Sequence, residues 1–172
     1  IETISKELTK NNISHCIVSK GYKKKIKGTV VVSNQKQIVS SIEQSGDEPF
    51  MLAHSLNNIP IIVGDKAEAI EIAIEKFKPK LILLDDGFQS LKLKRDYDIV
   101  LVDLSREFNN YKLLPLGFLR EPFSSLKRAS LIIFTKSNQR TRESEKIKKM
   151  VLKNINQSAK TYDSNLDQQD RK

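Results

Sequence analysis

The stretch LILLDDGFQ, residues Leu81–Gln89, decides the fold of this chain. Four consecutive apolar residues, followed by an Asp-Gly pair, predict a buried β-strand that ends in a turn. Such a strand puts paired carboxylates at the carboxyl edge of a sheet, where open α/β proteins bind ligands and where an aspartate can hold magnesium. The stretch therefore indicates a site for a nucleotide and a divalent metal.

Helix-like and strand-like patterns alternate on both sides of this stretch. The spacing of apolar residues predicts helices over residues 1–11, 48–56, 66–77 and about 142–154, and strands over 13–19, 29–33, 59–63, 81–84, 98–103 and 131–134. Asp65 is placed to cap the helix 66–77. Strands that alternate with helices predict an α/β fold with a doubly wound, mostly parallel sheet.

The ends of the chain differ from its middle. Ile1 stands inside a helical pattern with no capping residue before it, so we expect the chain to be a fragment of a longer protein. Residues 156–172 are polar and have no periodicity. We expect residues 1–155 to form the α/β domain, and residues 156–172 to be a polar tail or the cut edge of a larger protein.

Composition limits the class of protein. The 172 residues are 38% hydrophobic and 30% charged, as in an ordinary soluble domain. The net charge of +9 favours an anionic partner: a nucleic acid, a phosphorylated substrate or an acidic membrane surface. Cys16 is the only cysteine, which excludes a disulfide framework and favours a reducing compartment. No apolar run approaches the roughly 18 residues that span a bilayer.

Several common sites have no support in the sequence. Neither Gly-x-x-x-x-Gly-Lys-Ser/Thr nor Gly-x-Gly-x-x-Gly is present, so neither phosphate-binding loop lies within these residues. Cys16, His15 and His54 lack the spacing of zinc ligands, and we expect both histidines to be structural. There is also no Gly-x-Ser-x-Gly nucleophile elbow.

Two acids, Asp47 and Glu48, precede Pro49 at an expected helix start. An aspartate there can simply cap the helix and stabilise it by about 1 kcal/mol. The same position also holds a carboxylate at the sheet edge, where it could deprotonate an attacking hydroxyl in phosphoryl transfer. Asp85 and Asp86 are similarly ambiguous, because Asp-Gly is a favoured turn pair.

Taken together, the motifs resemble one enzyme family. Gly46–Pro49, Asp85–Gln89, Leu114–Gly117 and Leu119–Pro122 follow Val18–Tyr22 in an order and at a spacing similar to those of the tetraacyldisaccharide 4'-kinases, which phosphorylate the lipid A precursor. The resemblance covers nearly the whole chain, and it implies a truncated sheet of the P-loop NTPase type. It also implies transfer of a phosphate from ATP, with Mg²⁺, to the 4'-hydroxyl of a lipid A disaccharide.

The resemblance assigns roles to individual residues. It makes Asp47 the catalytic acid-base aspartate, and Asp85 with Asp86 the magnesium-binding pair. We expect Asp86, which is nearer the turn, to contribute more to the metal and to catalysis. The remaining matches face the nucleotide (Glu48, Gln89, Arg120, Glu121) or the substrate (Lys20, Tyr22). The implied location is the cytoplasmic face of the bacterial inner membrane, with peripheral membrane contact and no nucleic acid.

The chain departs from the family pattern in three respects. Lys20 replaces an arginine and loses a bidentate donor. Ser90 stands where the family has a histidine. The phosphate loop, which the family places before the first helix, and a later Asp-His-His type motif are both outside these residues. We therefore expect the 172 residues alone to be inactive.

Two other classes remain open on the residues alone. A basic α/β module could bind polyanions without catalysis, and the lysines of residues 20–27 could serve either solvation or an anionic lipid surface. Four carboxylates at strand ends oppose polyanion binding unless a metal intervenes. A receiver-like signalling domain would explain Asp85 and Asp86, but it leaves Asp47 and Arg120 without a role.

Overall fold

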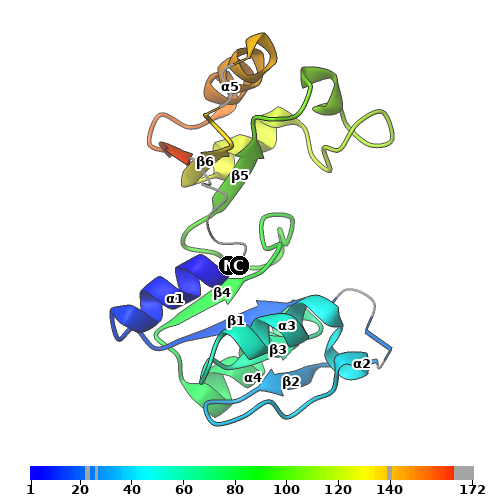
Figure 1. Cartoon of the computed structure of the whole chain (residues 1–172), viewed down its shortest axis with the longest axis vertical. Helices are drawn as coiled ribbons and strands as arrows, with labels where there is room; N and C mark the ends of the chain where they lie inside the picture. The colour runs from blue at the N-terminus through cyan, green and yellow to red at the C-terminus, as the bar shows by residue number, and fades with distance from the viewer. Residues whose placement is uncertain (22–23, 26, 139–140, 165–172) are drawn as a thin grey trace. The chain divides into compact units, whose positions relative to one another are not determined.

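The computed structural model describes residues 1–21, 24–25, 27–138 and 141–164 (Figure 1). The chain divides into two compact units, residues Ile1–Gln89 and Ser90–Lys172, which we call unit 1 and unit 2. Each unit has its own sheet, and the two are described separately below.

Unit 1 is built on a four-stranded sheet in the order β2-β3-β1-β4. Its strands are β1 (His15–Ser19), β2 (Val30–Ser33), β3 (Ile61–Val63) and β4 (Leu81–Leu84). The central strand β1 is parallel to both β3 and β4, while β2 is an antiparallel edge strand. The carboxyl ends of the three parallel strands therefore meet at one edge of the sheet.

Helices cover both faces of this sheet, as expected for a doubly wound fold. The helices of unit 1 are α1 (Glu2–Lys10), α2 (Ile42–Ser45), α3 (Asp47–Ser55) and α4 (Lys66–Phe77). Side chains alternate along a strand, so Ile17 packs in the cluster that contains Ala53 of α3, while Cys16 and Val18 pack with Ala69 and Ala73 of α4.

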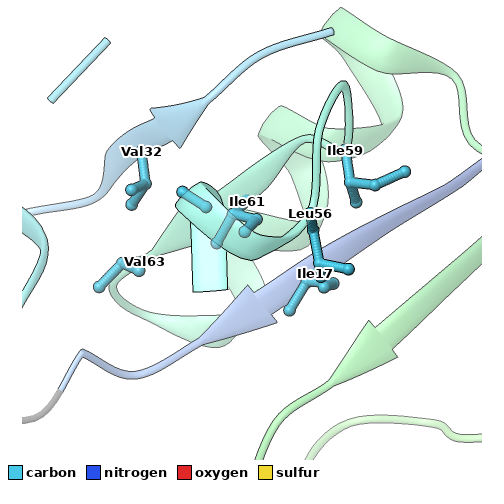
Figure 2. Packing of buried hydrophobic residues seen from close by; sticks show 7 residues of the cluster. Ile17, Val32, Leu56, Ile59, Ile61 and Val63 are labelled. Carbon is cyan, nitrogen blue, oxygen red and sulfur yellow. The ribbon is translucent and has the colours of Figure 1, made fainter. Parts of the chain in front are cut away.

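The core on the α3 side is aliphatic and closely packed. Figure 2 shows Ile17, Val32, Ile61 and Val63 from three strands next to Leu56 and Ile59, which come from the segment that leads out of α3. Each of these side chains is less than 9% exposed. This packing fixes the strands whose ends carry the polar residues of the candidate site.

Unit 2 contains a parallel three-stranded sheet in the order β5-β6-β7. Its strands are β5 (Ile99–Asp103), β6 (Leu131–Thr135) and β7 (Lys160–Ser164), joined by the 3₁₀ helices η1 (Phe108–Asn110) and η2 (Phe123–Arg128) and the helix α5 (Arg142–Asn154). Ile132 and Phe134 of β6 are fully buried, as are Ile147 and Val151 of α5.

Most elements lie where the sequence predicts them. The helices 66–77 and 142–154 have the predicted bounds, and Asp65 caps α4 by accepting hydrogen bonds from the amides of Ala67 and Glu68. Both ring nitrogens of buried His15 have partners, Ser5 and the carbonyl of Ile13, which confirms a structural role.

Other details differ from the sequence prediction. The pattern did not predict α2, η1, η2 or β7, nor the division of the strands between two sheets. Residues 160–164, placed above in a polar tail, form a strand that pairs with β6. Ile74 and Leu101 belong to the apolar patterns that predict the helix 66–77 and the strand 98–103, but they are 55% and 66% exposed. In α4 only the small residues Ala69 and Ala73 are buried, and in β5 only Val102 is buried. The buried face of each element is therefore narrower than its apolar pattern suggests.

Whether residues 1–155 act as one domain stays a prediction. Among the described helices, none has the length and apolarity to cross a membrane.

Candidate active site

A cleft of about 530 Å³ opens at the carboxyl edge of the sheet in unit 1. Five chain segments line it: the start of α1, the end of β1, helix α3, the start of β3 and the residue after β4. Helices that follow parallel strands bring their amino termini to this edge, which explains why polar residues gather there. The lining combines polar residues (Glu2, Ser19, Asp47, Glu48, Ser55, Asp85) with apolar ones (Ile1, Pro49, Met51, Leu52, Ile61).

The pairing of β1 with β4 positions Asp85. The amide of Asp85 donates to the carbonyl of Val18 at 2.8 Å, which continues the ladder one residue past the strand. The hydroxyl of Ser19, a residue only 8% exposed, donates to Oδ2 of Asp85 at 3.1 Å. Backbone and side chain of Asp85 are therefore both held by the end of β1.

Gly46 determines where α3 begins. Its φ of 87° and ψ of 161° lie in a region that is essentially open only to glycine. Gly46 is the N-cap residue, so Asp47 and Glu48 are the first two residues of the helix, and both are exposed. The interpretation of Asp47 as the capping residue is therefore wrong, because glycine occupies that position.

The turn after β4 separates the two adjacent aspartates. Asp86 adopts a left-handed conformation with a φ of 47°, and its carbonyl accepts a hydrogen bond from Nζ of Lys66. A Cβ on Gly87 would lie 2.9 Å from Cβ of Leu84, so the turn is closely packed against the strand. Asp85 lines the cleft, whereas Asp86 is exposed and is not among the lining residues. The preference for Asp86 in metal binding stays a prediction.

The basic segment after β1 passes close to the same edge. Gly21 has a φ of 72°, and a Cβ there would meet Cγ1 of Val63 at 2.1 Å and the carbonyl of Ser45 at 3.1 Å. Only glycine therefore fits between the end of β3 and the residue that precedes Gly46. Lys20 is exposed, and Tyr22 lies outside the described residues.

The remaining predicted site residues are Gln89, Arg120 and Glu121. Gln89 is an exposed residue at the end of unit 1, and Arg120 and Glu121 belong to unit 2. Burial would raise the pKa of Glu121, but hydrogen bonds from Arg128 and Ser125 outweigh burial and lower it. The ion pair of Glu121 with Arg128 measures 2.7 Å.

The donor set of the cleft suits magnesium better than zinc. Within the described part of the chain, no three His, Cys, Asp or Glu side chains converge into a ready-made metal site. Magnesium does not need such a site, because it keeps several waters and commonly uses one or two carboxylates together with substrate phosphates. The carboxylate of Asp85, which lines the cleft and is oriented by Ser19, fits that requirement.

Three residues near this edge were not predicted as site residues. Ser19 orients Asp85, Glu2 lines the cleft and pairs with Lys6 at 2.7 Å, and Lys66 binds the Asp86 carbonyl. The hydrogen bond from Lys6 is the largest cause of the lowered pKa of Glu2. The position of Ser19 at the end of a predicted buried strand was a signal in the sequence that it could belong to the site. For Glu2 and Lys66, the only signal in the sequence was a position in the first turn of a helix.

The comparisons with known proteins identify the relatives of this chain. A family model described as tetraacyldisaccharide-1-P 4'-kinase matches residues 1–172. The chain belongs to this family. The tetraacyldisaccharide 4'-kinase of Halothermothrix orenii is 37% identical over 164 residues, which cover 94% of this chain and 42% of that protein. The tetraacyldisaccharide 4'-kinase of Elusimicrobium minutum is 41% identical over 153 residues, 86% of this chain and 41% of that protein.

A solved structure of the family has the same fold. The crystal structure of the apo form of LpxK from Aquifex aeolicus in complex with ATP matches with a TM-score of 0.74 and 30% identity, over 94% of this chain and 48% of that chain. The chain thus spans less than half the length of these tetraacyldisaccharide 4'-kinases. The resemblance inferred from the motifs is confirmed, and so is the α/β fold of the P-loop NTPase type.

Proposed function

We propose that the protein containing this chain transfers the γ-phosphate of ATP to the 4'-hydroxyl of a tetraacyldisaccharide 1-phosphate, a precursor of lipid A. The observation that carries this proposal is the cleft that gathers Asp47, Glu48 and Asp85 in a chain matched over its whole length by the kinase family. The ATP complex of the structural neighbour supports ATP as the phosphate donor.

In the proposed reaction, the 4'-oxygen of the sugar forms a bond to the γ-phosphorus while the bond from that phosphorus to the β–γ bridging oxygen breaks. ADP leaves, and Asp47 accepts the proton of the hydroxyl. Asp47 suits this role because it is exposed in the first turn of α3, at the edge of the cleft. An exposed carboxylate can reach a substrate without first breaking a structural contact.

Mg²⁺ would neutralise negative charge on the transferring phosphate, and Asp85 and Asp86 would hold it directly or through water. Ser19 keeps the Asp85 carboxylate turned toward the cleft. The family resemblance assigns Glu48, Gln89, Arg120 and Glu121 to the nucleotide, and Lys20 and Tyr22 to the sugar substrate. The reaction would take place at the cytoplasmic face of the bacterial inner membrane, where the lipid substrate lies.

The proposal is tested by the variant Asp47→Asn in the full-length protein. Asparagine keeps the shape of the side chain but cannot accept the proton, so we expect kcat to fall by roughly 10²- to 10⁴-fold. The KM for ATP should change little, because Asp47 is assigned to the sugar hydroxyl. Steady-state kinetics with ATP and the lipid disaccharide measure both quantities.

Asp96→Asn is the matched control for this experiment, since Asp96 is exposed and lies in unit 2. This control should keep the parent kinetics. A kcat for Asp47→Asn equal to that of the control would contradict the role of Asp47 as the general base.

A further inference from the structure

An unusual concentration of exposed apolar side chains occupies the loop Leu113–Leu119 in unit 2. The exposed fractions are 47% for Leu113, 61% for Leu114, 81% for Leu116 and 63% for Phe118. Single exposed leucines are common on protein surfaces, but four large exposed apolar side chains within six residues of one loop are a concentration of the kind that marks an interaction site.

The loop is an ordered structure with its own hydrogen bonds. The amide of Leu114 donates to the carbonyl of Leu119, and the amide of Leu119 donates to the carbonyl of Lys112, both at 3.0 Å. The amide of Phe118 donates to the backbone carbonyl of Asn110 at 2.9 Å. Because these amides are already paired, the loop can leave water without the cost of burying them unsatisfied.

Glycine is required at the base of this loop. A Cβ on Gly117 would lie 2.5 Å from the carbonyl oxygen of Lys112 and 2.7 Å from that of Asn110. The close approach of these backbone segments leaves the side chains of Leu116 and Phe118 on the outside. In Figure 1 the loop is the yellow-green segment between β5 and η2.

Positively charged residues adjoin the apolar loop. Lys112 and Arg120 flank the loop, and no acidic residue lies between them. The guanidinium of Arg106 lies 4.8 Å from the centroid of the Phe118 ring. Apolar side chains with cations beside them match the boundary of an anionic bilayer, where acyl chains lie below negatively charged head groups.

We propose that the loop Leu113–Leu119 inserts into the interfacial region of an anionic lipid bilayer. This inference rests on the proposed function for its context, a kinase whose substrate is a lipid. The loop leads directly into Arg120 and Glu121, which are assigned to the nucleotide. Insertion of the loop would hold these two residues close to the surface that presents the sugar hydroxyl.

The test uses the full-length protein and sedimentation with vesicles of mixed phosphatidylglycerol and phosphatidylcholine. The double variant Leu116→Ser with Phe118→Ser removes the two most exposed side chains of the loop. We expect its partition coefficient to fall at least about tenfold, because two large apolar groups no longer leave water. Binding equal to that of the parent protein would overturn the inference.

Leu91→Ser with Tyr162→Ser is the matched control, because these side chains are 65% and 60% exposed in the same unit. The control should bind vesicles as the parent does. An equal loss in both double variants would overturn the assignment to this loop, since it would show a general response to surface apolarity.

A second variant, Phe118→Trp, reports the surroundings of the loop without removing its apolar character. Its emission, taken as the difference from the parent protein, should shift to the blue on addition of vesicles and be quenched by brominated lipids. Emission that is already blue-shifted and does not respond to vesicles would overturn the inference, because another part of the protein would then cover the loop.

Lipid binding and phosphate transfer can fail independently. A protein that binds vesicles through the loop but lacks kinase activity leaves this inference standing and removes the proposed function. A protein that phosphorylates detergent-dispersed substrate but does not bind anionic vesicles removes this inference and leaves the proposed function standing.

Discussion

At the scale of single residues, the contact between Ser19 and Asp85 is the most informative feature of the candidate site. A nearly buried hydroxyl at the end of β1 donates to a carboxylate that follows β4. Residues that orient a metal-binding side chain commonly alter metal affinity by 10- to 100-fold when they are replaced. Ser19 therefore belongs to the proposed mechanism, although it need not touch the substrate.

Replacement of Ser19 by alanine should raise the Mg²⁺ concentration required for half-maximal activity by about tenfold. It should also lower the free energy of unfolding by about 1 kcal/mol, the usual contribution of one hydrogen bond. Ser33→Ala is the control, because the buried hydroxyl of Ser33 donates to the carbonyl of Ile59 at 2.7 Å in the same sheet. Equal Mg²⁺ requirements in the two variants would remove Ser19 from the metal site.

Asp103 supplies a prediction about pH. Burial opposes the charged form, but hydrogen bonds from Lys136 at 2.9 Å and from Ser105 outweigh it and lower the pKa of Asp103 from 3.8 to about 2. Because the pKa is lower in the folded state, Asp103 contributes stability above pH 3.8, and this contribution is lost as the pH falls toward about 2.

Urea unfolding of the wild-type protein and Asp103→Asn, at pH 7 and at several values down to about 2, measures this contribution. The variant should be less stable at pH 7, and the difference should shrink across the interval from about 4 to 2. A difference that stays constant with pH would show that the charge of Asp103 does not contribute. Asp96→Asn controls for the loss of an exposed carboxylate.

At the scale of elements, α4 illustrates how a single cap fixes the start of a helix. Asp65 accepts hydrogen bonds from the amides of Ala67 and Glu68, at 3.0 and 3.2 Å. The helix then buries Ala69 and Ala73 against the sheet. The cap also sets the position of Lys66, which binds the carbonyl of Asp86 in the turn after β4.

Asp65→Ala should therefore lower the free energy of unfolding by about 0.5–2 kcal/mol, since two amides lose their partner. Asp65→Asn, which retains an acceptor, should stay close to the parent protein. Chemical denaturation followed by circular dichroism provides the measurement. Equal losses in the two variants would assign the effect to the charge of Asp65 and not to the cap.

At the scale of the whole molecule, net charge and the apolar loop act on the same proposed partner in different ways. The chain carries 30 Lys and Arg residues against 21 Asp and Glu residues, a net charge of +9. Attraction of exposed charges to an anionic surface is screened by salt, whereas insertion of apolar side chains is not weakened in this way.

The affinity for anionic vesicles should therefore fall as the salt concentration rises from roughly 0.05 to 0.5 M, and then level off above zero. The residual binding at high salt should disappear in the Leu116→Ser, Phe118→Ser variant. Phosphatidylcholine vesicles provide the uncharged control in the same sedimentation assay. Binding to anionic vesicles that does not change with salt would contradict an electrostatic contribution.

The sequence by itself determined the alternation of helices and strands, because apolar spacing and local caps act over a few residues. The apolar stretch before Asp85, the cap at Asp65 and the helices 66–77 and 142–154 were all readable in this way. The order and spacing of short motifs also determined the family, and this inference proved correct.

Only the tertiary structure decided which residues meet. Ser19 and Asp85 are 66 positions apart, and their contact depends on the parallel pairing of β1 with β4, which no local pattern specifies. The start of α3 at Gly46 and the exposure of Leu116 and Phe118 likewise depend on backbone packing. Sequence patterns report local preferences, whereas contacts between distant segments arise from the pairing of strands and the packing of the core.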